Sequence, residues 1–281
     1  MTNSNVSLDD KYSIESGRIF VTGVQALARI PMVQRQRDVL EGLNTAGFIS
    51  GYRGSPVGGF DQQLWRAKKF LEQNHIRFQP GLNEDLAASA IWGSQQTNLH
   101  EGGKYDGVFA IWYGKGPGVD RCGDVFKHGN MSGPAKHGGV LLIAGDDHAA
   151  KSSTVPHQSE YAFMDASIPV LNPAGVQDIV DYGILGFAMS RFSGCWVAFK
   201  TTAENMDSSA SIDVSPDRVK ISLPKFDMPE GGLSIRWPDD WIEQEHRLHQ
   251  YKLNAVRAFA RQNKIDKTII NSQNPKLGVV T

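Results

Sequence analysis

The chain is poor in cysteine, in net charge and in long apolar runs. Cys122 and Cys195 are its only cysteines, too few for a four-thiolate iron–sulfur cluster or a cysteine-based zinc site. A formal net charge of -1 at pH 7 gives no electrostatic reason to expect nucleic acid or an anionic membrane as a partner. No apolar run reaches the roughly 18 residues that a membrane-spanning helix needs.

What remains is the composition of an ordinary globular protein. Its 281 residues are 40% hydrophobic and 21% charged, enough to bury a large core. The first ten residues are polar and acidic, unlike a signal peptide. The eight histidines show no metal-binding spacing, so we expect no metal held by this chain. We therefore expect a soluble, cytoplasmic protein whose two cysteines are buried, unreactive thiols.

Short apolar runs alternate with longer helical stretches up to about residue 207. Strands are expected at 47–52, 76–79, 107–113, 139–145, 168–172 and 195–201. Helices are expected at about 60–73, from Glu84 onward, and at 176–191. Near-continuous apolar strands that alternate with helices indicate a parallel sheet covered on both faces. The sequence therefore predicts an α/β fold, a doubly wound, mostly parallel sheet with helices on both faces.

The pattern changes after Asp207. Residues 208–232 are expected to be a loop with one short strand at 218–223. Residues 238–264 are expected to form one long helix, because proline is tolerated in a first turn. An apolar stripe and a basic, solvent-exposed face are predicted for it. The stripe comprises Trp241, Leu248, Tyr251, Ala255 and Phe259, and the basic face Arg247, Lys252, Arg257 and Arg261.

The last residues, 276–281, have the β-branched, apolar character of a strand. Such a strand either closes the existing sheet or opens a second domain that this chain lacks, and the pattern favours the second. We therefore expect residues 1–235 to form one α/β domain. Residues 236–281 would be a linker helix and the first strand of a following, absent domain.

Ligands of such sheets bind at the carboxyl ends of the strands, so the loops there are informative. In the first, residues 52–59, Gly54 lets backbone approach a ligand and Pro56 stiffens the turn. Arg53 offers a guanidinium group that can bind a carboxylate through two hydrogen bonds, and Ser55 offers an uncharged hydrogen-bond donor. The alternative is a common strand-to-helix turn in which the glycines serve only geometry.

The loop after the third strand, residues 114–121, has glycine at 114, 116 and 118. It lacks the last glycine of the dinucleotide fingerprint, and no serine or threonine follows Lys115 as a Walker loop requires. Lys115, Arg121 and the amide-rich turn instead suit a carboxylate or carbonyl oxygen. Gln79 and Pro80 end the second strand where a dinucleotide-binding domain has an acidic residue, which argues against that class.

Asp146, Asp147 and His148 follow the fourth strand, with Ser152 and Ser153 shortly behind. Paired carboxylates beside a histidine suit acid–base chemistry or a divalent cation. The alternative is a surface loop in which one of the serines caps the next helix. The residues have no reliable metal-ligand spacing.

Glu84 opens a helix rich in small residues. An acid at a helix start is commonly placed there by the helix dipole alone. Here a turn suited to a ligand precedes it, and small side chains let the helix approach a neighbouring surface closely. Ordinary packing against the sheet explains these small residues as well; they are Ala87, Ala88, Ala90 and Gly93.

Together these loops resemble the pyrimidine-binding domain of the thiamine-diphosphate-dependent 2-oxoacid:ferredoxin oxidoreductases, in particular the indolepyruvate ferredoxin oxidoreductase group. Residues 51–56, Gly-Tyr-Arg-Gly-Ser-Pro, are similar to the family's Gly-Tyr-Pro-x-Thr-Pro turn. Asn83 and Glu84 resemble the segment that holds its cofactor-activating glutamate. Residues 145–147 with 152–153, and then 200–202, match in order and spacing. The similarity covers about 16–202, and 276–281 resemble the opening of the family's next domain.

The resemblance implies a role for each loop. Glu84 would hydrogen-bond N1′ of the aminopyrimidine and so promote loss of the thiazolium C2 proton, after which a 2-oxoacid is decarboxylated. Cofactor contacts are implied for Tyr52, Gly54 and Pro56. Ser55 would lie near the substrate carbonyl or carboxylate.

Three basic residues are expected to bind the substrate. Arg53 stands where the family usually has proline, and we expect it to bind the substrate carboxylate, as we do Lys115 and Arg121. The resemblance implies a 2-oxoacid with an aryl side chain, as in indolepyruvate, or a branched one.

The family holds the diphosphate and Mg²⁺ with a Gly-Asp-Gly…Asn segment on a separate domain, and this sequence has no such segment. Iron–sulfur clusters would likewise be held elsewhere. The resemblance thus implies half a cofactor site, inactive by itself. The expected partners are a diphosphate-binding domain or subunit, an iron–sulfur domain or ferredoxin, and a second copy in a homodimer. The competing hypothesis is a catalytically silent interaction module of the same fold, against which the retention of Glu84 argues.

Overall fold

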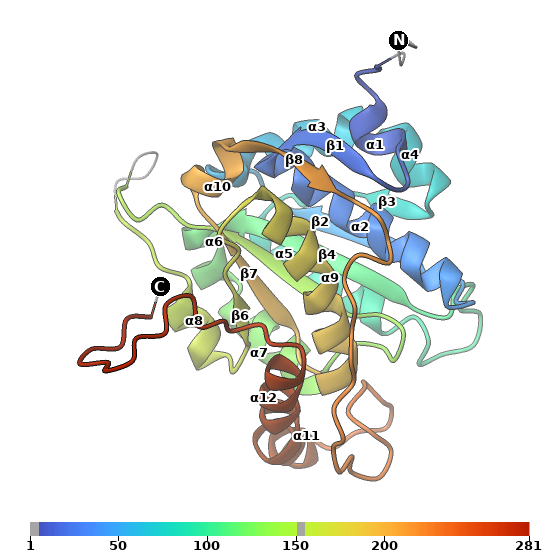
Figure 1. Ribbon diagram of the computed structural model, residues 1–281. Helices are drawn as coiled ribbons and strands as arrows, with labels where there is room; N and C mark the ends of the chain where they lie inside the picture. The colour runs from blue at the N-terminus through green and yellow to red at the C-terminus, as the bar shows by residue number, and fades with distance from the viewer. Residues whose placement is uncertain (1–5, 151–154, 281) are drawn as a thin grey trace.

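A six-stranded parallel sheet forms the centre of the protein, in a computed structural model that describes residues 6–150 and 155–280. The strand order is β3-β2-β4-β5-β7-β6, and helices cover both faces of the sheet (Figure 1). The expected doubly wound α/β fold is confirmed. The strands are β2 (Ala46–Gly51), β3 (Ile76–Phe78), β4 (Val108–Lys115), β5 (Val140–Gly145), β6 (Val170–Leu171) and β7 (Val197–Thr201).

Two hydrophobic cores flank the sheet. The first lies under α2 (Gly23–Leu40), α3 (Phe60–Arg66), α4 (Lys68–Gln73) and α9 (Val176–Ser193). The second lies under α5 (Glu84–Gln95), α6 (Gly116–Arg121), α7 (Gly123–Ser132) and α8 (Glu160–Asp165). Along β4, Ile111 and Tyr113 enter the first core and Trp112 enters the second. Burial on both faces explains why the central strands are apolar almost throughout.

Each expected strand segment up to residue 201 overlaps an observed strand, and the expected and observed ends differ by no more than two residues. The helix expected at 60–73 is divided at Ala67 into α3 and α4. Three short helices, α1 (Asp10–Ser13), the 3₁₀ turn Val57–Gly59 and α10 (Ala203–Asp207), complete this part of the described chain.

A small antiparallel ribbon lies beside the main sheet and is not predicted by the sequence patterns. In it, β1 (Arg18–Thr22) pairs with β8 (Ser209–Asp213). The strand β8 is short and polar, and it buries only Ile212. The expected strand at 218–223 is wrong: Val219 and Ile221 pack on the first core, but the segment pairs with no other strand.

The long C-terminal helix is confirmed. It runs through α11 (Trp241–Arg247), a π-helical turn (Leu248–Lys252) and α12 (Leu253–Gln262). Phe259 of α12 packs on Phe192 of α9 with ring centroids 5.9 Å apart. The helix is thereby fixed to the first core.

The faces of this helix differ from the expectation. Trp241 is 73% exposed, so it lies off the apolar stripe, whereas Lys252 of the expected basic face is fully buried. The π-helical turn adds a residue to the repeat, which rotates α11 against α12 by about 100°. Arg247 is also buried, in an ion pair with Asp239, while Arg257 is exposed as expected, and so is Arg261.

Lys252 caps another helix from inside the protein. Its Nζ donates to the carbonyls of Asn130 (3.1 Å) and Met131 (2.7 Å), in the last turn of α7. A cation suits the carbonyl end of a helix dipole. Burial lowers the pKa of Lys252 to about 8.

Beyond α12, residues 263–280 form neither helix nor strand, and residues 276–280 are exposed. The strand expected at 276–281 is therefore not formed by residues 276–280. Among the described residues, no helix combines the length and the apolar composition that crossing a membrane requires.

Candidate functional site

The loops singled out by the sequence meet at one edge of the sheet. At the carboxyl ends of the strands, Gly51 of β2 lies beside Tyr113 of β4. Lys115 at the end of β4 lies beside Gly145 of β5, which in turn lies beside Thr201 of β7. The turns that follow β2, β4 and β5 therefore emerge next to one another, as expected for parallel strands.

The turn after β2 folds over the ends of β4 and β5. A Cβ atom at Gly54 would lie 2.8 Å from Lys115 Cβ, and one at Gly145 would lie 2.9 Å from Pro56 Cδ. Both approaches are closer than real Cβ atoms make, so these two positions require glycine. Gly54 thus lets the backbone of the turn lie close to the Lys115 side chain, and Gly145 lets the end of β5 lie close to Pro56.

Three polar side chains of the turn face solvent. Tyr52 is 43% exposed, and Ser55 is exposed as well. The Arg53 side chain is 76% exposed, with its Nε 3.9 Å from Asp61 Oδ2. An ion pair this open contributes little stability, so the guanidinium stays accessible to a second carboxylate.

Glu84 is fixed at the start of α5. Asn83 caps the helix by accepting a hydrogen bond from the Leu86 N–H at 2.8 Å. The indole Nε1 of Trp112, a fully buried side chain of β4, donates to the Glu84 carbonyl at 3.0 Å. Just before the helix, the Gly81 N–H donates to Gly51 O, so Glu84 lies near the end of β2.

The half-buried Glu84 side chain lies against the first turn of α6. A Cβ atom at Gly118 would come within 2.5 Å of Glu84 Cγ and 2.9 Å of Oε1, so glycine alone leaves room for this carboxylate. Cys122, the residue directly after α6, is fully buried, and burial raises the pKa of its thiol; the Asp85 and Glu84 carboxylates add to the effect.

The two basic residues expected near the substrate flank α6. Lys115 is the residue before the helix and is half-buried, whereas Arg121 is the last residue of the helix and is exposed. The structure thus brings Glu84, Lys115 and the turn of residues 52–56 to one edge. Arg121 lies farther off, at the other end of α6.

His157 also lies at this edge of the sheet, although the sequence patterns did not single it out. The Nε2 atom of His157 lies 2.8 Å from Asp120 Oδ2, and its Nδ1 lies 3.4 Å from Asp146 Oδ1. Asp146 also accepts hydrogen bonds from the Ser159 N–H (2.8 Å) and hydroxyl (2.5 Å). Asp146 and His157 lie in one loop, but Asp120 lies in α6, so no pattern within a single segment indicates the contact.

The first carboxylate of the loop after β5, Asp146, forms hydrogen bonds within that loop. Asp146 is buried and holds Ser159, the residue that precedes α8; the Ser159 hydroxyl donates to Asp146 and caps no N–H of the helix. Ser152 and Ser153, named for this role, lie outside the described residues. Within residues 6–150 and 155–280, no three histidine, cysteine, aspartate or glutamate side chains are placed to hold a metal ion.

At the same edge of the sheet, the end of β7 carries a buried ion pair. Lys200 is 7% exposed and pairs with Glu160 at the start of α8. Burial is the largest single influence and would raise the pKa of Glu160, but the hydrogen bonds from Lys200 and the backbone, together with the charge of Lys200, hold that pKa below its ordinary value.

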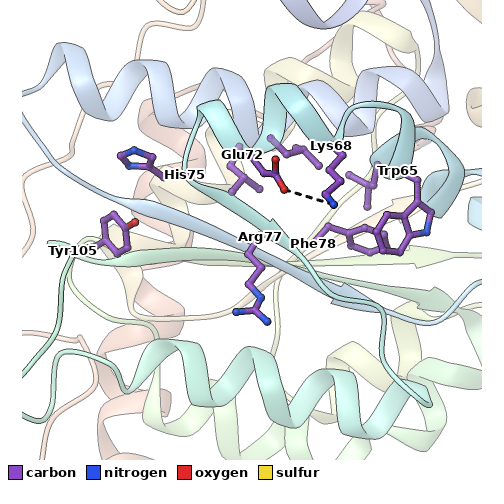
Figure 2. Close-up of a pocket in the computed structure, with 10 residues that line it drawn as sticks. Trp65, Lys68, Glu72, His75, Arg77, Phe78 and Tyr105 are labelled. Carbon is purple, nitrogen blue, oxygen red and sulfur yellow. Dashed lines mark ion pairs between the residues drawn. The ribbon is translucent and has the colours of Figure 1, made fainter.

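A separate pocket of ≈ 490 Å³ lies at the edge strand β3, under α3 and α4 (Figure 2). Trp65 packs against Phe78 there, with ring centroids 4.9 Å apart, and Lys68 pairs with Glu72 at 3.8 Å. None of the site residues expected from the sequence lines this pocket. The candidate site is the edge around Glu84, whose side chain is half-buried.

Comparison with known proteins gives a likeness of fold. No protein-family model and no curated protein match the chain. Among solved structures, it is similar to a 2-oxoglutarate:ferredoxin oxidoreductase from Magnetococcus marinus, determined with 2-oxoglutarate, coenzyme A and succinyl-CoA bound. The TM-score is 0.58 with 15% sequence identity, over 86% of this chain and 46% of that chain. The chain thus has a fold found in that enzyme and spans less than half of the enzyme chain's length.

Proposed function

We propose that this chain is the pyrimidine-binding portion of a thiamine-diphosphate-dependent 2-oxoacid:ferredoxin oxidoreductase. On this proposal Glu84 is the carboxylate that activates the cofactor. The fold shared with a solved 2-oxoglutarate:ferredoxin oxidoreductase supports it. The observation that carries it is the position of Glu84, whose carboxylate lies at the ligand-binding edge of the sheet against a glycine that leaves room for it.

The residues present fit the aminopyrimidine half of the cofactor. A half-buried carboxylate is partly accessible to a ring nitrogen, and partial burial strengthens the hydrogen bond it makes. The exposed Tyr52 ring provides an amphipathic surface beside the turn, and Gly54 with Pro56 shapes that turn. When bound, thiamine diphosphate supplies the electron sink for decarboxylation of a 2-oxoacid.

Glu84 has one task in this scheme, which is to hold a proton between its carboxyl group and N1′ of the ring. The contact with Gly118 restricts the orientations of the carboxylate. The bond from Trp112 to the Glu84 carbonyl restricts the backbone. A general acid–base group works well when it is fixed in this way before the reaction starts.

The substrate would meet the turn and the end of β4. Arg53 and Lys115 bring positive charge to this edge, which favours a 2-oxoacid carboxylate. The Ser55 hydroxyl is exposed beside them and would donate to the keto or carboxylate oxygen. Arg121 would attract the 2-oxoacid anion as it approaches the site. We propose aryl pyruvates such as indolepyruvate, or branched-chain 2-oxoacids, as substrates.

The proposal requires other polypeptide segments. A diphosphate-binding domain or subunit would hold the diphosphate and Mg²⁺, and an iron–sulfur domain or ferredoxin would accept electrons. We place the pyrimidine-binding domain at residues 1–235, and in 236–281 a linker helix and the first strand of a following domain. A homodimer would complete the assembly.

The test is 2-oxoacid oxidation by the assembly purified through a tag on this chain. Reduction of a viologen dye is followed with indolepyruvate, phenylpyruvate, a branched-chain 2-oxoacid and 2-oxoglutarate. We expect dye reduction that depends on thiamine diphosphate and is fastest with an aryl or branched substrate. An assembly that contains the chain and oxidises none of these acids would refute the proposal and favour a silent interaction module.

A further inference from the structure

Two glycines in the first turn of α6 are each covered by a side chain from another part of the chain. A Cβ atom at Gly116 would lie 2.2 Å from His157 Nδ1, and one at Gly118 would lie 2.5 Å from Glu84 Cγ. Residues two apart on a helix point about 200° apart around its axis. The turn is therefore held from opposite sides, by an imidazole and by a carboxylate.

The imidazole ties α6 to the sheet. Its Nε2 lies 2.8 Å from the Oδ2 of Asp120, four residues after Gly116 and so on the same face of α6. Its Nδ1 faces Asp146, which is buried at the end of β5. One ring thus bridges the helix and the strand end.

The backbone of His157 is itself anchored. Its N–H donates to the Asp147 carbonyl at 3.3 Å, and its carbonyl accepts from His148 Nδ1 at 3.1 Å. Two residues further on, Ser159 makes two hydrogen bonds to Asp146. The imidazole is consequently held in place by β5 and its loop.

We infer that His157 is a positioning residue for Glu84. By covering Gly116 and pairing with Asp120, it fixes the turn of α6 so that Gly118 holds the Glu84 carboxylate in one orientation. The inference rests on the function proposed for Glu84. A helix of six residues is too short to be stable by itself, so α6 depends on such contacts.

Hydrogen–deuterium exchange of the full chain tests, without cofactor or partner, whether His157 holds α6 in place; this contact of His157 with Gly116 and Asp120 is called the clamp. In His157→Ala we expect amide exchange in α6 to rise about tenfold or more, because local opening becomes easier. His157→Gln, whose amide still reaches toward Asp120, should give a smaller rise. The control His128→Ala removes an exposed histidine of α7 and should leave α6 unchanged. Unchanged exchange in His157→Ala overturns the inference.

Turnover by the assembly tests the link to Glu84. For His157→Ala we expect kcat to fall about 10- to 100-fold while KM stays within about twofold, because the carboxylate is misplaced and the substrate site is not. His157→Gln should recover part of kcat. Looser α6 with unchanged kcat would overturn the link. If the wild-type assembly oxidises no 2-oxoacid, the proposed function fails, and the exchange result alone decides whether the clamp exists.

Discussion

The Glu84 side chain occupies the space that any side chain at Gly118 would need. A methyl group there would come within 2.5 Å of Glu84 Cγ and 3.0 Å of Cδ. The orientation of the carboxylate is therefore a property of two segments, the start of α5 and the first turn of α6. Any change that moves either segment should alter the chemistry of Glu84.

Gly118→Ala should separate these two segments. We expect turnover of the assembly to fall about 10- to 100-fold, because Glu84 must leave its position. Overpacking should lower stability by roughly 1–3 kcal/mol. Dye reduction and thermal unfolding measure the two effects.

Gly123→Ala is the matched control, because a Cβ atom there would meet nothing within 4 Å. This change at the start of α7 should leave turnover intact and stabilise the helix by up to about 1 kcal/mol. Equal activities of the two variants would show that the Gly118 contact has no catalytic importance.

Lys252→Ala should destabilise the protein. The change removes a buried side chain and the donor for two carbonyls of α7, a loss of about 2–4 kcal/mol. Arg257→Ala, on the exposed side of the same helix, should change stability by no more than about 0.5 kcal/mol. Denaturant unfolding of both variants measures the difference, and similar losses would contradict the buried position of Lys252.

Cys195 predicts a loss of stability in alkaline solution. Burial raises the pKa of its thiol from 9.0 to about 11. Because the folded state keeps the proton that the unfolded state releases, the contribution is fully present below pH 9 and is lost as the pH rises toward 11. A shift of this size corresponds to roughly 2 to 3 kcal/mol.

Denaturant unfolding under reducing conditions between pH 8 and pH 11 measures this contribution. Cys195→Ala should flatten the fall in stability relative to the wild type. Cys122 is present in both proteins and leaves the comparison unaffected; Lys252 is also present in both, but a charged Cys195 raises its pKa, so the comparison reports the two groups together. Parallel pH curves for the two proteins would show that the Cys195 thiol is not held protonated by burial.

Local signals in the sequence were sufficient for the main parallel sheet. The strands β4 and β5 are buried on both faces, so their apolar runs could not be mistaken for exposed segments. In contrast, β8 is polar and short, so it can be recognised as a strand only from its pairing with β1. The burial of Lys252 was hidden by the π-helical turn, because a regular repeat places that residue on the basic face.

The candidate site was only partly predictable. The start of the Glu84 helix and the glycines of the turn after β2 have local signatures in the sequence. The structure places both at one edge of the sheet. The contacts of Glu84 with Gly118 and of His157 with Asp120 join segments that are distant in sequence. Folding alone brings such residues together, so no pattern within one loop indicates them.

Exchange of the C2 proton of thiamine diphosphate in the purified assembly tests the role of Glu84 most directly. Proton NMR after transfer to deuterated solvent compares the wild type with Glu84→Gln and Asp85→Asn, the latter a neighbouring acid in the same helical turn. We predict that Glu84→Gln slows exchange about 100-fold or more while the chain stays folded, and that Asp85→Asn exchanges at the wild-type rate. Wild-type exchange in Glu84→Gln would contradict the assignment of Glu84 as the activating carboxylate.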